Sequence, residues 1–473
     1  MSARHVVVAG YGMAGARLAD EIRRRDPDAE RVRLTIVGAE PHPAYNRVLL
    51  SSVLAGGMTA ATVRLHDEEW AARANVDLRV GESVVAIDRE NRVVETTGGV
   101  LGYDALVLAT GAEPWLPPVD GLEPGPGVLT FRTLDDCARI LDAAQPGAPL
   151  AVLGGGLLGL EAARGLAGRG ANVTVVHPHG HVMERQLDAG AGRVLARRLA
   201  ELGVSFRFDA TAARHLPGDG LKLDDGSFVP ADLVVVAAGV RPETTLAEAA
   251  GLAVDRGVLV DDLLRTSDGR IHALGDCARH DHAPAGLVQP AWEQAAVLAD
   301  LLTGADTAAR YRGTRVVTRL KARGVDLTAL GETHAGDHTD ADVLTIDDPS
   351  GGRYGKLVVR DNRVTGAILL GLPDAAATVT QLHDRGIPLP EDRLAVLLGR
   401  ALPAGAPAAA SPVDLPASAL ICRCNAVTKG RLVEAWRGGA TDVAALARAT
   451  RATTGCGGCH DTVSAVAGWL AAQ

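Results

Sequence analysis

Short apolar runs of β-forming residues lead into helical patterns at two places in the chain. His5–Ala9 is one such run, and apolar positions recur at helical spacing through residues 16–22. Pro149–Leu153 is a second run, and the helical pattern after it continues to about Arg169, where Gly170 ends it. An apolar strand joined to a helix by a short turn is the opening unit of a parallel α/β sheet. The hydrophobic pattern therefore predicts two α/β domains.

Both predicted turns are glycine-rich with the same spacing, G-x-G-x-x-G. In this motif the first glycine permits a tight turn, the second lets the backbone approach a pyrophosphate, and the third lets helix and strand pack closely. The helix N-terminus then offers free N–H groups to an anion. The sequence predicts two dinucleotide sites, one at Gly10, Gly12 and Gly15 and one at Gly154, Gly156 and Gly159.

The end of the second strand in each domain bears on which nucleotide binds. Val32–Val37 is followed by Glu40, whose carboxylate can accept hydrogen bonds from a ribose diol. Asn172–Val176 is followed by His177, and neither His177 nor His179, His181 and Arg185 after it repel a 2′-phosphate as an acid would, which slightly favours NADPH. The sequence leaves NADH and NADPH both open at this second site. A second flavin site or a degenerate fold is the alternative interpretation.

Three further motifs resemble the flavoprotein reductases that carry two dinucleotide-binding domains. Ala109–Ala112 resembles their A-T-G turn, Gly239–Pro242 their G-x-R-P stretch, and Ile271–Asp276 their second FAD fingerprint. The order of these motifs implies that the nicotinamide domain is inserted into the flavin domain. The resemblance implies FAD contacts at Thr110, Gly111, Gly275 and Asp276, the last of which would hold the ribitol chain.

A narrower resemblance lies in Pro41–Gly56. This stretch is similar to the large subunit of assimilatory NAD(P)H nitrite reductases and to the electron-transfer subunit of assimilatory nitrate reductases. It implies that Arg47 contacts FAD, with an ordinary surface charge as the alternative. Glu161, on the helix after the second glycine turn, is a candidate for lining the nicotinamide site. A solvated or capping carboxylate is the alternative for Glu161.

Composition and charge exclude several classes of partner. The chain has 473 residues, 47% of them hydrophobic and 22% charged, which is typical of globular domains. Its net charge is −9, it has no block of basic residues, and aromatics make up 3%, so we expect no nucleic-acid partner. The uncharged stretch Ala143–Leu160 is broken by prolines and glycines, which argues against a membrane span. Without a visible targeting segment, we expect a cytoplasmic protein.

The cysteines divide into two groups. Cys137 and Cys277 stand alone, and we predict that both are buried packing residues. The dithiol motifs of disulfide reductases are absent before residue 400, so flavin electrons need another exit. The other four cysteines form a C-x-C pair and a C-x-x-C pair near the C-terminus, a thiolate set that suits zinc or iron–sulfur. These are Cys422, Cys424, Cys456 and Cys459.

The spacing of the four C-terminal cysteines resembles the bacterioferritin-associated-ferredoxin module. In that family all four cysteines bind a [2Fe–2S] cluster, whereas zinc ribbons usually have two C-x-x-C pairs closer together. Helices are predicted over Lys429–Trp436, capped by Thr428, and from near Asp461. Their N-terminal ends would favour an anionic cluster.

These observations predict an α/β fold with two three-layered Rossmann-like dinucleotide-binding domains, an α+β interface domain and a small helical [2Fe–2S] domain. Strand-like runs at Val343–Ile346, Lys356–Val359 and Val364–Leu370, with a closing helix, mark the interface domain. A proline-rich stretch after it is typical of a linker. The expected boundaries are 1–117 and 245–310 for the FAD domain, 118–244 for the NAD(P)H domain, 311–398 for the interface domain, 399–418 for the linker and 419–473 for the [2Fe–2S] domain.

The predicted cofactors define an electron path. A nicotinamide gives up two electrons as a hydride, a cluster accepts one, and a flavin can do both, so no general base is required. We expect NAD(P)H to reduce FAD and FAD to reduce the cluster. The resemblance implies a separate nitrate or nitrite reductase chain as the acceptor, since no cysteines remain for a sirohaem centre and no room for a molybdopterin domain. A free-standing NAD(P)H:ferredoxin or rubredoxin reductase and an iron- or redox-responsive binding protein remain alternatives, and a homo-oligomer stays open.

Overall fold

The computed structural model describes residues 3–281, 286–336, 340–400, 415–422, 425, 427–453 and 459–472. Their backbone contacts divide the chain into two compact units. The first unit combines Met1–Val48, Thr59–Trp115 and Val240–Thr314. The second combines Leu49–Met58, Leu116–Gly239 and Arg315–Gln473.

A five-stranded parallel sheet forms the centre of the first unit, with strand order β19-β7-β1-β2-β3. In the register of β1 and β2, Val8 lies opposite Ile36, and neither side chain is exposed. Parallel strands that are covered on both faces read as continuous apolar runs, which explains the pattern of the N-terminal sequence. The strands are β1 (Arg4–Ala9), β2 (Val32–Gly38), β3 (Val76–Val80), β7 (Ala105–Leu108) and β19 (Ile271–Ala273).

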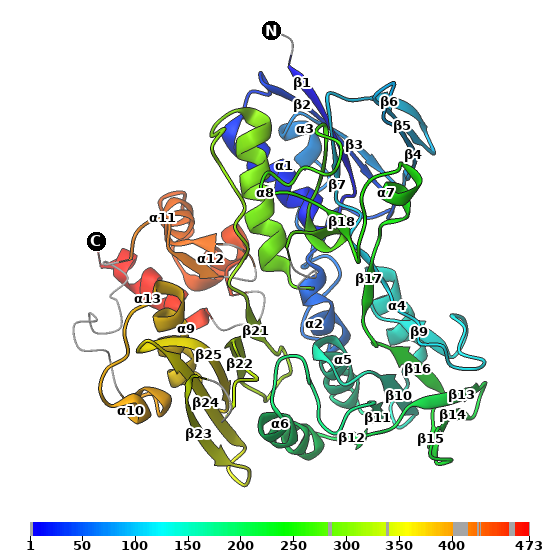
Figure 1. The fold of residues 1–473 in the computed structure, drawn as a ribbon, viewed down its shortest axis with the longest axis vertical. Coiled ribbons are helices and arrows are strands. Elements are labelled where there is room, and N and C mark those ends of the chain that lie inside the picture. The colour runs from blue at the N-terminus through cyan, green and yellow to red at the C-terminus, as the bar shows by residue number, and fades with distance from the viewer. Residues whose placement is uncertain are drawn as a thin grey trace. The chain divides into compact units, whose positions relative to one another are not determined.

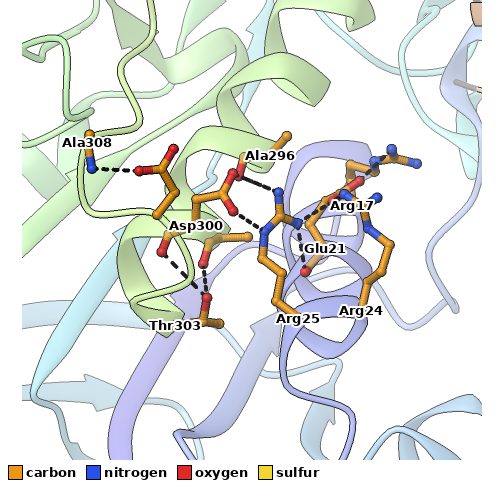
Figure 2. Close-up of polar contacts among 10 residues, drawn as sticks. Arg17, Glu21, Arg24, Arg25, Ala296, Asp300, Thr303 and Ala308 are labelled. Atoms are coloured by element: carbon orange, nitrogen blue, oxygen red, sulfur yellow. Dashed lines mark hydrogen bonds and ion pairs between the residues drawn. The ribbon is translucent and has the colours of Figure 1, made fainter. Parts of the chain in front are cut away.

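Helices α1 (Met13–Arg25) and α8 (Val288–Thr303) pack side by side in the first unit (Figure 1). A network of charges joins them, because Arg25 of α1 bonds to Asp300 of α8 with 2.6 Å between Nε and Oδ1. Burial alone would raise the pKa of the neighbouring Glu21 carboxyl, but surrounding guanidinium groups hold it below its usual value. These guanidinium groups belong to Arg17, Arg24 and Arg25 (Figure 2).

Smaller elements complete the first unit. They include an antiparallel sheet of three strands and two pairs of short strands, of which one pair joins the A-T-G and G-x-R-P motifs. The strands are β4 (Val84–Asp88), β5 (Val93–Thr96), β6 (Gly99–Gly102), β8 (Ala112–Pro114), β17 (Val240–Pro242), β18 (Val258–Leu259) and β20 (Ala278–Arg279). The helices are η1 (Arg47–Leu49), α3 (Trp70–Arg73), α7 (Thr245–Ala249) and η2 (Gly275–Cys277).

A second parallel sheet of five strands lies in the second unit, with order β12-β11-β10-β16-β9 (Figure 1). Two of its strands, Pro149–Leu153 and Asn172–Val176, lie at the residues that the apolar pattern predicts. The strands are β9 (Val128–Thr130), β10 (Pro149–Leu153), β11 (Asn172–Val176), β12 (Val204–Arg207) and β16 (Leu233–Val236). The other elements here are α2 (Leu50–Leu54), α4 (Leu134–Ala143), α5 (Leu157–Ala167), α6 (Ala189–Glu201), β13 (Ala212–Leu216), β14 (Gly220–Leu223) and β15 (Phe228–Pro230).

The predicted interface region is an antiparallel sheet with two helices. Its strand order is β21-β22-β25-β24-β23, and the three predicted strands are confirmed as β23, β24 and β25. The sequence pattern missed the two strands that precede them. The elements are β21 (Val317–Arg319), β22 (Leu327–Gly331), β23 (Asp342–Asp348), β24 (Arg353–Arg360), β25 (Arg363–Leu370), α9 (Pro373–Arg385) and α10 (Arg393–Leu397).

The C-terminal part is small and mainly helical, as predicted. Thr428 caps α11, because its hydroxyl oxygen accepts the N–H of Arg431 at 3.3 Å. Most of the predicted linker, residues 401–414, lies outside the described residues. The elements are β26 (Leu420–Cys422), β27 (Val427–Thr428), α11 (Lys429–Arg437), α12 (Val443–Thr450) and α13 (His460–Ala471).

Two parallel five-stranded sheets, an antiparallel α+β part and a small helical part confirm the predicted fold class. Among the described residues, no helix combines the length and the apolar character that a membrane crossing requires.

One buried histidine makes the first unit sensitive to acid. His272 in β19 is 5% exposed, and burial, together with the nearby Arg4 guanidinium, lowers its pKa to about 4. Since an unfolded histidine titrates near 6.5, the unfolded chain binds this proton first as the pH falls. We expect the contribution of His272 to stability to be constant above pH 6.5 and to decline by about 2 kcal/mol between pH 6.5 and pH 5.

Thermal melts of the wild-type protein and of His272→Asn between pH 8 and pH 5 test this expectation. The variant carries no titrating ring, so its melting temperature should fall less steeply over that range. Equal slopes for the two proteins would contradict the assignment to His272.

Candidate functional site

The first glycine turn leaves open space at its middle glycine. Gly10 has φ +122°, and a Cβ there would lie 2.2 Å from the carbonyl oxygen of Ala109. A Cβ on Gly15 would lie 2.0 Å from the carbonyl oxygen of Gly10. A Cβ on Gly12 would meet nothing within 4 Å, and Gly12 is also the N-cap of α1. The outer glycines are thus required by close backbone packing, whereas Gly12 keeps a free approach to the helix N-terminus, which fits a pyrophosphate.

The second glycine turn repeats this geometry. Gly154 has φ +114°, and a Cβ there would lie 2.4 Å from the carbonyl oxygen of Ala237. A Cβ on Gly159 would lie 2.0 Å from the carbonyl oxygen of Gly154. A Cβ on Gly156, the N-cap of α5, would meet nothing within 4 Å. Both turns therefore fit a dinucleotide at the same relative position.

The structure brings Glu40 and Arg47 together after β2. The Arg47 guanidinium forms an ion pair with the Glu40 carboxylate, and the Tyr45 hydroxyl donates to the other carboxylate oxygen at 2.6 Å. The Arg47 guanidinium also lies over the Tyr45 ring, 5.0 Å from its centroid. Glu40 and Arg47 are 31% and 24% exposed, so both remain accessible to a ligand. This arrangement fits the two flavin-side contacts that the sequence assigns to them.

Thr110 and Gly111 lie where β7 ends. The Thr110 hydroxyl donates to the carbonyl oxygen of Glu243 at 2.9 Å, and the N–H of Glu243 donates to the carbonyl oxygen of Gly111 at 2.9 Å. Gly111 has φ +78°, a left-handed conformation that favours glycine. These bonds fix the A-T-G turn against the start of the last segment of the first unit, Val240–Thr314.

Gly275 and Asp276 follow β19 in the short helix η2. The N–H of Gly275 donates to the side-chain oxygen of Gln294 at 2.8 Å. A Cβ on Gly275 would lie 3.0 Å from the Cβ of Ala14, so this turn packs against the beginning of α1. The stretch that resembles the second FAD motif therefore lies beside the first glycine turn.

His177 lies at the end of β11, beside the second glycine turn. It is 3% exposed, and its Nδ1 accepts the N–H of Gly155 at 3.1 Å. Its Nε2 lies 3.2 Å from a carboxylate oxygen of Glu184, a residue that the sequence analysis did not single out. Glu184 lies in a loop without periodicity, seven positions beyond His177, so no spacing rule pointed to it.

Glu161 is buried in an ion pair. Its side chain is 1% exposed, and the Lys321 ammonium lies 2.7 Å from both carboxylate oxygens. The backbone N–H of Lys321 donates to the same carboxylate at 3.0 Å. The pairing ties α5 to the loop between β21 and β22. Whether Glu161 also lines the nicotinamide site stays a prediction.

The two single cysteines are packing residues, as predicted. Cys137 and Cys277 are both 0% exposed and unbonded to other cysteines. Burial raises the pKa of the Cys137 thiol to about 11 and also raises that of Cys277. Neither thiol is therefore ionised at neutral pH, which rules out a reactive thiolate at both positions.

Cys422 and Cys459 come together in the core of the C-terminal part. The contact with the Cys459 thiol, aided by donors from Asn425 and Thr453, lowers the pKa of Cys422 to about 6. The N–H of Thr453 donates to the Cys459 sulfur at 3.3 Å, and the Asn425 amide donates to the Cys422 sulfur at 3.7 Å. Donors aimed at sulfur fit thiolates that ligate an anionic cluster. Cys424 and Cys456 lie outside the described residues.

Three family models match the chain in the order that the sequence predicts. The model of the pyridine nucleotide-disulphide oxidoreductases matches residues 4–296. The rubredoxin NAD+ reductase C-terminal domain matches residues 317–384, and the BFD-like [2Fe-2S] binding domain matches residues 420–467.

Two proteins of Bacillus subtilis (strain 168) are similar along almost the whole chain. One is a nitrite reductase [NAD(P)H], 37% identical over 98% of this chain and 58% of its own. The other is an assimilatory nitrate reductase electron transfer subunit, 35% identical over 98% of this chain and 59% of its own. The chain thus spans less than two thirds of the length of these relatives.

Among solved structures, the covalent putidaredoxin reductase–putidaredoxin complex is similar, with a TM-score of 0.74 and 27% identity. The match covers 82% of this chain and 95% of that one. Together the matches confirm the predicted kind of protein, an NAD(P)H-dependent FAD oxidoreductase with a [2Fe–2S] domain. The individual site residues remain assignments from motif and geometry.

Proposed function

The chain belongs to the pyridine nucleotide-disulphide oxidoreductase family, and on that premise we propose its place in electron transfer. It takes electrons from NAD(P)H and passes them through FAD to a [2Fe–2S] cluster. The cluster then delivers them to a separate catalytic chain that reduces nitrate or nitrite. The proposal includes the five-part division of the chain expected from its motifs, with the nicotinamide domain inserted into the flavin domain.

One observation carries the proposal: a single chain combines two open dinucleotide turns with a cysteine core for a cluster. Gly12 and Gly156 each leave a helix N-terminus accessible, so each turn can hold a pyrophosphate. Cys422 and Cys459 are buried with N–H donors on both sulfurs. The bound cofactors supply hydride and single-electron chemistry, and the protein supplies binding and orientation.

The relatives favour nitrate or nitrite reductase over other acceptors. The two Bacillus proteins match 98% of this chain, including the cluster domain, and one of them is named an electron transfer subunit. The second candidate is a free-standing rubredoxin or ferredoxin reductase. It is favoured by the match of residues 317–384 to the rubredoxin NAD+ reductase C-terminal domain.

The proposal is tested by reconstitution. The FAD- and iron-loaded chain is mixed with a molybdenum nitrate reductase or a sirohaem nitrite reductase, and NADH or NADPH is added without oxygen. We expect the coenzyme to bleach both the flavin and the iron–sulfur absorbance. We also expect the mixture to reduce nitrate or nitrite faster than either component alone.

The outcomes separate the candidates. Bleaching without stimulation of either reductase, but with rapid reduction of an added rubredoxin or ferredoxin, would transfer the proposal to the second candidate. A loaded chain whose flavin is not reduced by either coenzyme would overturn both. The matched control is the same mixture with chain that has been loaded with FAD but not with iron.

A further inference from the structure

The acid that commonly marks an NADH-binding Rossmann domain is missing from the end of β11, where His177 stands instead. The structure shows how His177 is fixed. Its Nδ1 accepts the N–H of Gly155 at 3.1 Å, so a neutral ring carries its proton on Nε2. Nε2 lies 3.2 Å from a carboxylate oxygen of Glu184. Nε2 therefore faces this carboxylate at an ion-pair distance, although the two atoms are not in hydrogen-bond geometry.

The backbone holds Glu184 at the same place. The N–H of Met183 donates to the carbonyl oxygen of Gly155 at 2.9 Å. Met183 is fully buried and has φ +54°, a left-handed conformation that is uncommon for methionine. Both polar backbone groups of Gly155, the residue before the open Gly156, thus position the loop that carries Glu184. The Glu184 side chain is 27% exposed, which leaves it accessible to a ligand.

We infer that Glu184 accepts the hydroxyl groups of the adenosine ribose, in place of an acid at the end of β11, and that the chain therefore uses NADH in preference to NADPH. This inference rests on the proposed function, because it assigns the coenzyme of the second dinucleotide site. Glu184 is the specificity-determining residue, and His177 is a positioning residue that acts through it.

Charge at the loop supports the preference. The neighbouring His177 ring lowers the pKa of Glu184 to about 2, so this carboxylate is ionised at neutral pH. A 2′-phosphate carries a charge of roughly −1.5 to −2 and would be repelled by this carboxylate. Gly180 lies in the same loop as Glu184, and a Cβ built on Gly180 would lie 3.3 Å from a carboxylate oxygen of Asp209. A second carboxylate therefore lies beside this loop.

The histidines that left NADPH open in the sequence are already engaged. Nε2 of His179 lies 3.9 Å from the other Glu184 oxygen. His181 is turned toward the start of α6, because its Nε2 lies 3.3 Å from the carbonyl oxygen of Leu187. The loop therefore presents a carboxylate, supported by imidazoles, to the ribose.

The test compares two fragments that lack the nicotinamide, ADP-ribose and its 2′-phosphorylated form, by calorimetric titration of the FAD-loaded chain. We expect the wild-type chain to bind ADP-ribose at least about tenfold more tightly. Glu184→Gln should reduce that preference by about tenfold, because a hydrogen bond to a charged acceptor is lost and the repulsion disappears. His177→Phe, which removes the positioning imidazole, should reduce the preference in the same direction.

Glu201→Gln is the matched control, since this carboxylate is exposed on α6, pairs only with Arg198 among the described residues, and carries the same charge. It should leave the preference unchanged. A wild-type preference for the phosphorylated fragment, or an equal loss of both affinities in Glu184→Gln, would overturn the inference. If Glu184→Gln fails to fold, the wild-type preference alone decides. If neither reduced coenzyme reduces the flavin while ADP-ribose still binds with this preference, the proposed function fails, whereas the assignment of Glu184 to the ribose stands.

Discussion

Replacing Cys459 with serine is expected to stop electron delivery beyond the flavin while NAD(P)H still reduces the flavin. Cys459 is 8% exposed and lies against Cys422 at the start of α13. A serine hydroxyl keeps the size of the side chain, but it is a hard and rarely ionised ligand, whereas iron–sulfur sites select soft thiolates. We expect iron content to fall to a small fraction and onward transfer to fall by about a hundredfold or more.

Two measurements on the same preparation check this expectation. Rapid mixing with coenzyme follows flavin absorbance, and reduction of an external one-electron acceptor follows transfer through the cluster. Cys137→Ala is the matched control. That thiol is also buried and is not ionised, but it lies in α4, far in sequence from the C-terminal cysteines. Loss of flavin reduction in Cys459→Ser, or full retention of iron, would contradict the assigned order of the cofactors.

The parts of the site that the sequence predicts are those with local constraints. Gly15 is required by a close contact with Gly10, five positions earlier, and Gly10 by its positive φ of +122°, and such local constraints leave a fixed spacing in the sequence. The strands β10 and β11 were found at the predicted residues, because a buried parallel strand must be an uninterrupted apolar run. The cysteine pairs are recognisable in the sequence because metal ligands on one loop have short spacing, and of the four the structure describes Cys422 and Cys459, which lie together.

The parts that were missed depend on contacts that leave no such spacing. Glu184 meets His177 through an irregular loop that is held by backbone hydrogen bonds, among them the one from Met183 to Gly155. Lys321 meets Glu161 across 160 positions of sequence. The strands β21 and β22 are short, and short strands in an antiparallel sheet with one apolar face give little alternation to read. Tertiary contact, rather than local propensity, decides these features.

Replacing Lys321 with methionine is expected to destabilise the second unit by about 3–5 kcal/mol. Methionine keeps the length and volume of the lysine stem but removes the ammonium that lies 2.7 Å from both oxygens of Glu161. The Glu161 side chain is 1% exposed, and among the described residues its carboxylate would then keep only the backbone N–H of residue 321 as a donor. An unpaired buried carboxylate has lost its hydration without gaining a partner charge, which is the cause of the expected destabilisation.

A double variant identifies this cause. The double variant Glu161→Gln/Lys321→Met removes the buried charge and should recover most of the stability at pH 8. Arg198→Met, which breaks the exposed pair with Glu201, should change stability by less than about 1 kcal/mol. A Lys321→Met variant as stable as Arg198→Met would show that the pair contributes no more than a surface contact, because only a desolvated carboxylate makes the loss of its partner so costly.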